Sequence, residues 1–407
     1  MIAGWQTTTL GEACQFINGL WKGQDPPFVH VGVIRNTNFA KDGTLDDSDI
    51  AYLDVEVKKF AKRRLQFGDL VLEKSGGGPK QPVGRVVLFD KKQGDFSFSN
   101  FTAAIRVNET AALDPLYLHR YLHWFYLSGR TEAMQSHSTG IRNLNGDAYK
   151  AVTVAYPPIT EQRRIVAILD EAFEGIATAK ANAEKNLQNA RGLFAQLSGQ
   201  LIEQCSTVGM PVELQDLVEP DCSLSYGIVQ PGDEQVGGLP IVRPVDLGEE
   251  TISLAGLKRI DASLAASYQR TRLRGGDLLL CVRGTTGTVA IAAHELADAN
   301  VTRGIVPIRF DPAKLRQKLG YYLMRSGPVQ AQIRAKTYGT ALMQINIRDL
   351  RLLQLRVPPH EQQEPLIDQL QDLEVGTSEL ASTYARKLAA LDELRKSLLH
   401  QAFSGQL

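Results

Sequence analysis

The feature that most constrains this chain is an internal repeat with an offset of 201 residues. Pro157-Pro158 and Pro358-Pro359 each precede a long segment in which apolar residues recur every three or four positions. The first ladder consists of Ile165, Leu169, Ala172, Ile176, Ala179, Ala183, Leu187, Ala190, Phe194, Leu197 and Leu201. Adding 201 to each number gives a second ladder that is interrupted only by Thr377 and Arg395. The repeat therefore predicts two long helices with one pattern, each following a separate folded block.

The spacing within each ladder is that of a heptad repeat with one extra four-residue step, at Ala183 to Leu187 and at Tyr384 to Leu388. A seam this narrow requires a partner helix, and the natural partner is the other copy. We therefore expect the helices to pair as an antiparallel coiled coil, with the two blocks related by an approximate two-fold axis. The alternative is that each helix packs on its own block, although a core-facing helix normally carries a wider apolar stripe.

The two folded blocks repeat each other as well. Residues 64–72 parallel residues 272–280 at an offset of 208, and a glycine-containing loop follows each segment. The runs around the Gly-Asp turns predict short strands, and the segments 116–125 and 315–324 predict helices. The expected fold class is α+β, a tandem repeat of two mixed α/β domains that are each followed by a long helix.

The predicted domains differ in charge. They are a first mixed domain at 1–156, a central helical region at 157–208, a second mixed domain at 209–357 and a C-terminal helical region at 358–407. The mixed domains are slightly basic, with 18 basic against 16 acidic residues in the first and 18 against 15 in the second. The helical regions are acidic, with 5 against 6 and 4 against 8. This distribution permits DNA binding by local patches without establishing it.

Composition places the chain among folded soluble proteins, because 43% of its residues are hydrophobic and 22% are charged. No apolar run reaches the ~18 residues of a membrane span, and Met1–Leu10 lacks the pattern of a signal peptide. The four cysteines, Cys14, Cys205, Cys222 and Cys281, are far apart and form no CxxC pair. We therefore expect a cytoplasmic protein with reduced thiols and no metal site.

Several motifs resemble one known family, the specificity subunits of type I restriction-modification systems. Pro157–Ile165 is similar to the start of the family's central conserved region, and Pro358–Gln362 is similar to its second copy, one residue shorter before the Glu-Gln pair. The ending Leu391–Leu407 resembles the family's usual C-terminal sequence. The paired Gly-Asp-Leu turns and Tyr226–Pro231 resemble its target-recognition domains. The resemblance covers nearly the whole chain.

The resemblance implies a DNA-sequence-specificity subunit without chemistry of its own. Such a subunit recognises an asymmetric bipartite site with a nonspecific spacer, through two target-recognition domains that contact double-stranded DNA. It recruits two methyltransferase subunits and then two restriction or translocase subunits. No cofactor is expected on this chain: S-adenosylmethionine belongs to the methyltransferase, and ATP and Mg to the restriction subunit. The location implied is the cytoplasm of a bacterium or archaeon, at the nucleoid.

The candidate DNA-binding residues are basic side chains at matching places in the two copies, together with polar side chains able to read base edges. Those in the first domain are Lys62, Arg63, Arg64, Lys74, Ser75, Lys80, Arg85, Asn100, Arg142, Asn143 and Asn145. Those in the second are Arg270, Arg272, Arg274, Arg283, Thr285, Thr286, Arg303, Tyr338 and Gln344. Solvated charged faces, a mobile glycine hairpin and helix capping are the alternatives for these residues.

Two other functions remain open from the residues. Asp25-Pro26-Pro27-Phe28 fits the loop with which amino-methyltransferases grip a flipped base, but no convincing glycine-rich cofactor turn accompanies it, so a simple proline turn is the competing interpretation. A stand-alone or orphan DNA-binding module is the main alternative. His119 and His123 have the i, i+4 spacing of metal ligands, but we expect a half-buried or surface pair without metal.

Overall fold

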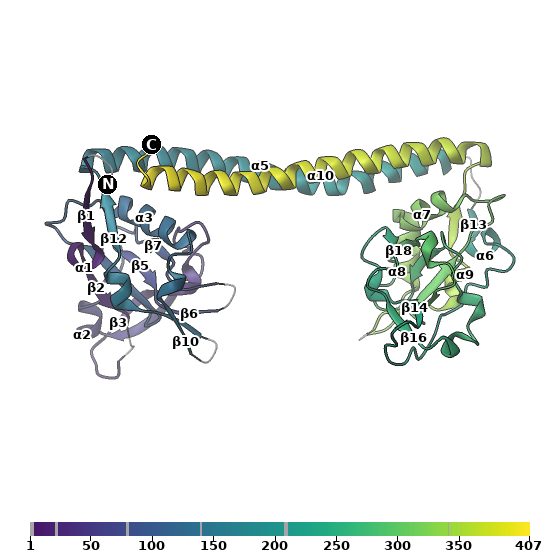
Figure 1. Ribbon diagram of the computed structural model, residues 1–407, viewed down its shortest axis with the longest axis horizontal. Coiled ribbons are helices and arrows are strands. Elements are labelled where there is room, and N and C mark those ends of the chain that lie inside the picture. Colours follow the sequence, from purple (N-terminus) through teal and green to yellow (C-terminus); the bar gives the residue numbers. More distant parts are fainter. Residues whose placement is uncertain (1–3, 21–22, 79–80, 139–140, 207–210, 341) are drawn as a thin grey trace. The chain divides into compact units, whose positions relative to one another are not determined.

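The chain folds into two compact units, seen here in a computed structural model that describes residues 4–20, 23–78, 81–138, 141–206, 211–340 and 342–407. Unit 1 comprises Met1–Ala183 and Arg386–Leu407, and unit 2 comprises Glu184–Ala385. Each unit holds one mixed domain and a part of each long helix (Figure 1). The predicted domain boundaries stay a prediction.

The mixed domain of unit 1 is built from short strands and a few helices. They are β1 (Gln6–Thr9), α1 (Leu10–Ala13), β2 (Cys14–Asn18), β3 (Phe28–Ile34), η1 (Asn36–Asn38), β4 (Ala51–Glu56), α2 (Val57–Ala61), β5 (Leu70–Glu73), β6 (Ser75–Gly77), β7 (Val86–Leu88), β8 (Phe96–Phe98), β9 (Thr102–Val107), α3 (Pro115–Leu127), η2 (Glu132–Met134), β10 (Gln135–Ser138), β11 (Ile141–Leu144), α4 (Gly146–Lys150) and β12 (Thr153–Tyr156). The sheets have the orders β2-β9-β5-β7, β4-β3-β8, β10-β11-β6 and β1-β12.

The mixed domain of unit 2 follows the same plan with some changes. Its elements are β13 (Pro211–Glu213), α6 (Leu214–Leu217), β14 (Leu239–Val242), η3 (Pro244–Asp246), β15 (Thr251–Ile252), β16 (Lys258–Ile260), η4 (Ala262–Ala265), η5 (Gln269–Thr271), β17 (Leu278–Cys281), β18 (Val289–Ala292), η6 (His294–Leu296), β19 (Asn300–Val301), β20 (Ile305–Ile308), α7 (Gln317–Arg325), α8 (Gly327–Lys336), α9 (Ile347–Arg351) and β21 (Gln354–Arg356). The sheets have the orders β15-β18-β17-β20, β16-β14-β19 and β13-β21.

The two domains share their central strand pairings. β5 pairs antiparallel with β7 and β9, as β17 does with β18 and β20. β3 pairs parallel with β8, as β14 does with β19. The strands predicted at the Gly-Asp turns are β5 and β17, and the predicted helices are α3 and α7. The predicted fold class, a tandem pair of mixed α/β domains with long helices, is thus confirmed.

The aspartate of each Gly-Asp turn fixes the turn to its sheet. Asp69 is 1% exposed, accepts a hydrogen bond from the backbone N–H of Gln66 at 2.7 Å, and pairs with Arg106 at 2.6 Å. Asp277 is equally buried and pairs with Arg309 at 2.7 Å. A buried carboxylate of this kind requires its cation, because an unpaired buried charge is strongly destabilising. The repeated motif is therefore structural.

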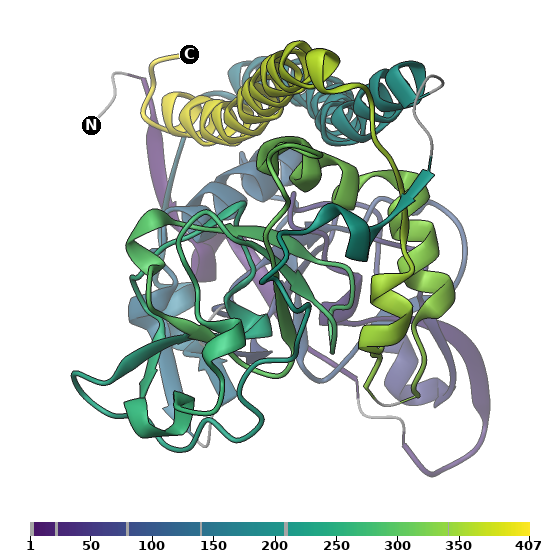
Figure 2. The same ribbon diagram turned by 90° about the vertical axis from the view of Figure 1, so that its right-hand side faces the viewer.

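The long helices α5 (Ile159–Ser206) and α10 (His360–Phe403) run antiparallel within each unit. In unit 1, the Arg164 guanidinium near the start of α5 donates to the backbone carbonyl of Leu407, whereas Lys180 further along pairs with Asp392 at 2.7 Å. In unit 2, the end of α5 packs in one core with the start of α10. Figure 2 shows these two segments side by side above the mixed domain of unit 2.

The residues of the apolar ladders are largely shielded from solvent, as expected for positions that face a packing partner. Every position of the first ladder is buried or half-buried, and in the second ladder only Leu380 is exposed, at 39%. The interruption at Arg395 has a reason, because its guanidinium lies over the Phe173 ring and donates to the carbonyl of Asp42 at 2.5 Å. At the other interruption, the Thr377 hydroxyl donates a hydrogen bond to the backbone carbonyl of Leu373 one turn earlier in the same helix.

A buried glutamine ties the start of each long helix to its mixed domain. The Gln162 amide donates to the carbonyls of Ala112 and Pro157 and accepts from the backbone N–H of Asp114, each at 2.8 Å. Gln363 makes the same three contacts in unit 2. The structural counterpart of Gln162 is therefore Gln363, at the offset of 201. In the sequence, the Glu-Gln pair of the second copy, Glu361-Gln362, ends one residue before this counterpart.

The histidine pair on α3 is fully buried, so the prediction of a half-buried or surface pair was wrong. His119 and His123 are 2% and 3% exposed, and the ring of His119 contacts the carbonyl of Gly43 at 2.9 Å. Burial lowers the pKa of both rings to about 3. Both are therefore neutral at physiological pH, in a core that the i, i+4 spacing alone could not distinguish from a surface.

Candidate nucleic-acid interface

Five predicted DNA-binding residues of unit 1 come together around the sheet β10-β11-β6. Ser75 on β6 lies opposite Asn143 on β11, and its hydroxyl donates to the Asn143 side-chain oxygen at 2.5 Å. Arg142 precedes Asn143 on β11 and is half-buried. The backbone N–H groups of Lys74 and Ser75 both donate to the carbonyl of Phe101, the residue after Asn100. The β8–β9 turn therefore borders this sheet.

Lys74 and its neighbour Asn18 complete the polar cluster of unit 1. The Lys74 ammonium donates to the side-chain oxygen of Asn18 at 3.0 Å. Burial lowers the pKa of Lys74 from its ordinary value of 10.5. A half-buried cation held by a neutral amide keeps its full charge available for an anion, such as a DNA phosphate.

Four predicted residues of unit 2 line one hollow of about 360 Å³, which we call the Arg283 hollow. It is lined by Tyr226, Val229, Val282, Arg283, Arg303, Tyr338, Gln344 and Ile345. Gln344 forms backbone bridges to both Arg283 and Tyr338, so the chain itself holds these side chains together. Residues distant in sequence, which were selected only by type, thus converge at one place.

The lining of the Arg283 hollow is positively charged. It contains two guanidinium groups and no carboxylate among the described residues. The Nε of Arg283 is buried and has no hydrogen-bond partner in the described part of the chain. Guanidinium groups without a carboxylate beside them favour an incoming anion or hydrogen-bond acceptor.

Tyr226 lines this hollow, although it was not predicted to bind DNA. Its hydroxyl donates to the carbonyl of Ile345 at 3.3 Å, and the side chain remains 41% exposed. Burial of the hydroxyl, and then Tyr338, raise the pKa of Tyr226. The available signal was the Tyr226–Pro231 motif, which was used only for the family resemblance.

Three other predicted residues of unit 1 are engaged in structural contacts. Arg85 is 14% exposed at its side chain and pairs with the buried Glu73 at 2.7 Å. Its two Nη atoms also donate to the backbone carbonyls of Phe39 and Asn36, so Arg85 has structural contacts and its DNA contact stays a prediction. Asn145 caps α4 by accepting from two backbone N–H groups. Arg63 donates to the carbonyl of Asn18 at 3.1 Å.

The remaining residues of the first basic run lie at the surface. Lys62 follows α2 and is exposed. Arg64 is 58% exposed and pairs with Asp95 at 2.8 Å. Exposed pairs of this kind contribute little and can be exchanged for a phosphate. Lys80 lies outside the described residues.

The basic run of unit 2 is largely matched by carboxylates. Arg272 pairs with Asp298 at 2.9 Å, and Arg274 pairs with Asp221 and Glu219. The hydrogen bond to Asp221 raises the pKa of Arg274. These ion pairs reduce the positive charge that the sequence suggested.

The other predicted residues of unit 2 lie outside this group of ion pairs. Arg270 is exposed, and so is Thr285. Thr286 donates to the carbonyl of Met343 at 3.2 Å, which ties the glycine loop to the segment that carries Gln344. Their DNA contacts stay predictions.

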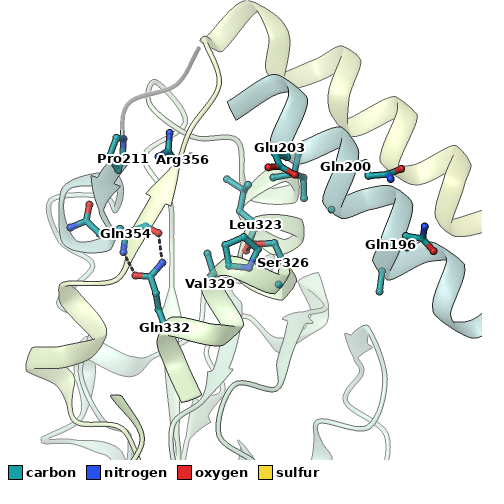
Figure 3. A pocket seen from close by; sticks show the side chains of 15 residues that line it. Gln196, Gln200, Glu203, Pro211, Leu323, Ser326, Val329, Gln332, Gln354 and Arg356 are labelled. Carbon is teal, nitrogen blue, oxygen red and sulfur yellow. Dashed lines mark hydrogen bonds between the residues drawn. The ribbon is translucent and has the colours of Figure 1, made fainter. Parts of the chain in front are cut away.

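A second hollow of unit 2, of about 780 Å³, contains none of the predicted residues. It lies between the end of α5, the start of α8 and β21 (Figure 3). The Gln332 side chain donates to the backbone carbonyl of Gln354 and accepts from its N–H, which holds α8 to β21. Its ionisable lining residues are Glu203 and Arg356, so it lacks the charge of a DNA surface.

The segments considered for metal binding, disulfides and membrane insertion show no such site in the described residues, and the segment considered for catalysis is exposed. Asp25, Pro26 and Pro27 are exposed in the segment before β3. In the described ranges, no group of three or more His, Cys, Asp or Glu side chains could hold a metal ion. Cys14, Cys222 and Cys281 are free and buried, and the side chain of Cys205 lies outside the described residues. None of the helices, over the residues searched, is long and apolar enough to cross a membrane.

Comparison with known proteins places the chain beside one group. A sequence profile for the type I restriction modification DNA specificity domain matches residues 2–188 and 213–388. The EcoBI type I restriction enzyme specificity subunit of Escherichia coli is 24% identical over 312 residues, which covers 70% of this chain and 65% of that relative. The putative MjaX specificity subunit of Methanocaldococcus jannaschii is 20% identical over 416 residues, covering 99% and 93%.

Two solved structures share the fold. A chain from a structure of the type I R-M system, described in terms of complex assembly and conformational transition, has a TM-score of 0.78 at 19% identity. The match covers 100% of this chain and 99% of that chain. The HsdS subunit from Thermoanaerobacter tengcongensis has a TM-score of 0.65 at 18% identity, with 100% of this chain and 98% of that chain covered.

Proposed function

The chain belongs to the family of type I restriction modification DNA specificity domains, and from that premise we propose that it is the DNA-sequence-specificity subunit of a type I restriction-modification complex. Its two mixed domains each read one half of an asymmetric bipartite DNA site, and the spacer between the halves is not read. The observation that carries this proposal is the repeat itself. One domain plan occurs twice, with different polar side chains at equivalent places.

The equivalent places are the cross-strand pairs Ser75–Asn143 and Arg283–Gln344. Side chains of different hydrogen-bonding capacity at one position prefer different base edges. Two copies of a domain with different side chains at that position therefore read two different half-sites. The exposed or half-buried cations around them supply phosphate contacts that orient the domain without reading sequence.

Partner subunits supply the chemistry in this proposal. Two methyltransferase subunits, which bind S-adenosylmethionine, dock on the chain, and two restriction subunits with ATP and Mg join through the complex. The chain itself is non-catalytic and acts in the cytoplasm at the nucleoid. Support for protein partners comes from the family match over residues 2–188 and 213–388.

Methylome sequencing of cells with and without the gene tests the proposal. We expect one bipartite methylated motif to disappear when the gene is deleted. An unchanged methylome would refute the specificity-subunit function and favour an orphan DNA-binding module. Purified chain incubated with labelled S-adenosylmethionine and DNA provides the second arm. Methyl transfer without a partner would refute the non-catalytic assignment and favour catalysis by the Asp25-Pro26-Pro27-Phe28 segment.

A further inference from the structure

The two mixed domains place one cross-strand pair of polar side chains at the same point of the fold. Ser75 precedes Arg283 by 208 residues and Asn143 precedes Gln344 by 201, which are the offsets of the surrounding segments. In unit 1 the pair joins β6 to β11, and in unit 2 the corresponding pair forms a backbone bridge. The backbone is thus retained while the chemistry of the side chains changes.

The pair in unit 2 presents mainly donors. A guanidinium can donate but cannot accept, and Arg283 and Arg303 both line the hollow. No carboxylate among the described lining residues accepts from these two guanidinium groups. The ligand it favours must therefore present acceptors at close spacing.

Two chemistries in DNA meet that requirement, the guanine edge with its O6 and N7 acceptors, and the phosphate oxygens. The surroundings distinguish them. Arg283 is half-buried in a recess shared with Tyr226 and Tyr338, which favours a flat aromatic edge. Arg303 is exposed, as a phosphate contact requires. Adenine fits less well, because it presents a donor at N6 beside its N7 acceptor.

We infer that Arg283 and Gln344, with Tyr226 beside them, recognise a guanine in one half-site. The Ser75–Asn143 pair is the equivalent specificity-determining position for the other half-site. Its side chains are short and neutral and offer a donor and an acceptor, so the two half-sites differ at this base. This inference rests on the proposed function and specifies the residues and the base chemistry through which it acts.

The test is selection of duplexes from a random-sequence library by the full-length protein and three variants. Arg283→Ala removes the donor fork, and Arg283→Lys keeps the charge without the bidentate geometry. Arg334→Ala is the matched control, because Arg334 on α8 is an exposed arginine of the same unit that does not line the hollow and was not predicted to bind DNA. Thermal unfolding of each variant checks that it folds. If Arg283→Ala does not fold, the comparison is made with Arg283→Lys instead.

We expect the wild-type protein to select a two-part motif with a fixed guanine in one half. Either Arg283 variant should relax the preference at that base by about 5- to 150-fold and leave the other half unchanged. In duplexes with 7-deazaguanine at that base, the wild-type protein should bind more weakly, whereas the Arg283→Ala protein should not. Arg334→Ala should alter no base preference.

The outcomes distinguish a failure of the proposed function from a failure of the guanine assignment. A wild-type protein that selects no two-part motif would overturn the proposed function together with this inference. A selected motif that Arg283→Ala leaves unchanged would overturn the inference alone. Equal loss of affinity for every sequence would assign Arg283 to a phosphate, and a relaxed base other than guanine would also contradict the inference.

Discussion

Replacing Gln162 by Ala should loosen unit 1 at the junction between α5 and its mixed domain. The change removes three hydrogen bonds of 2.8 Å and leaves two carbonyls and one N–H without their partner. Gln162 is fully buried, so water does not replace the lost bonds without rearrangement. At about 1 kcal/mol per bond, the free energy of opening should fall by roughly 3 kcal/mol.

Native-state hydrogen exchange measures this effect for each unit separately, because amide protection reports local opening. A loss of roughly 3 kcal/mol should accelerate exchange at the start of α3 and α5 by on the order of 100-fold. Gln363→Ala should produce the same effect at α7 and α10 of unit 2. Gln188→Ala is the control, because Gln188 is an exposed glutamine on the same helix α5. If Gln162→Ala and Gln188→Ala change exchange equally little, the reasoning is refuted.

Three further perturbations follow from buried charges and from the helices. Arg309→Met leaves Asp277 buried without its cation, so urea unfolding should show a loss of about 3–5 kcal/mol. His119 and His123 have pKa values of about 3, below the ordinary 6.5, so their stabilisation is complete above pH 6.5 and is lost as the pH falls. As the pH falls from 6.5 to 5, the free energy of unfolding should decrease by about 2 kcal/mol for each ring. Replacing both histidines by glutamine should flatten the pH dependence of the thermal midpoint. Four residues inserted after Ala183 should change the length of the unread spacer while both half-sites persist, as methylome sequencing would reveal.

The architecture was predictable because its signals are local or periodic. The apolar ladders follow from helical geometry, and the strands follow from short apolar runs next to Gly-Asp turns. The arginine at ladder position 395 does not interrupt helix α10, because its long side chain extends over the Phe173 ring. The repeat then extended each local prediction to a second copy.

The candidate site was only partly predictable, since residue type does not reveal the partner across a strand. Arg85 and Arg283 both lie in glycine-containing loops that follow the Gly-Asp strands. Arg85 faces Glu73 and is occupied, whereas Arg283 faces a hollow without a carboxylate among the described lining residues. Tyr226 was missed for the same reason. It reaches the site through tertiary contact with Ile345, 119 residues later.

The sequence by itself determined the tandem plan, the antiparallel helices and the set of side chains from which a DNA-reading surface could be drawn. Periodicity and repetition carry that information without reference to any distant contact. Only the tertiary structure decided which cations are free to act, because charge becomes available or neutralised through neighbours that folding supplies. Arg274 is matched by Asp221, whereas no carboxylate among the described residues lines the hollow beside Arg283, although both were DNA-binding candidates in the sequence.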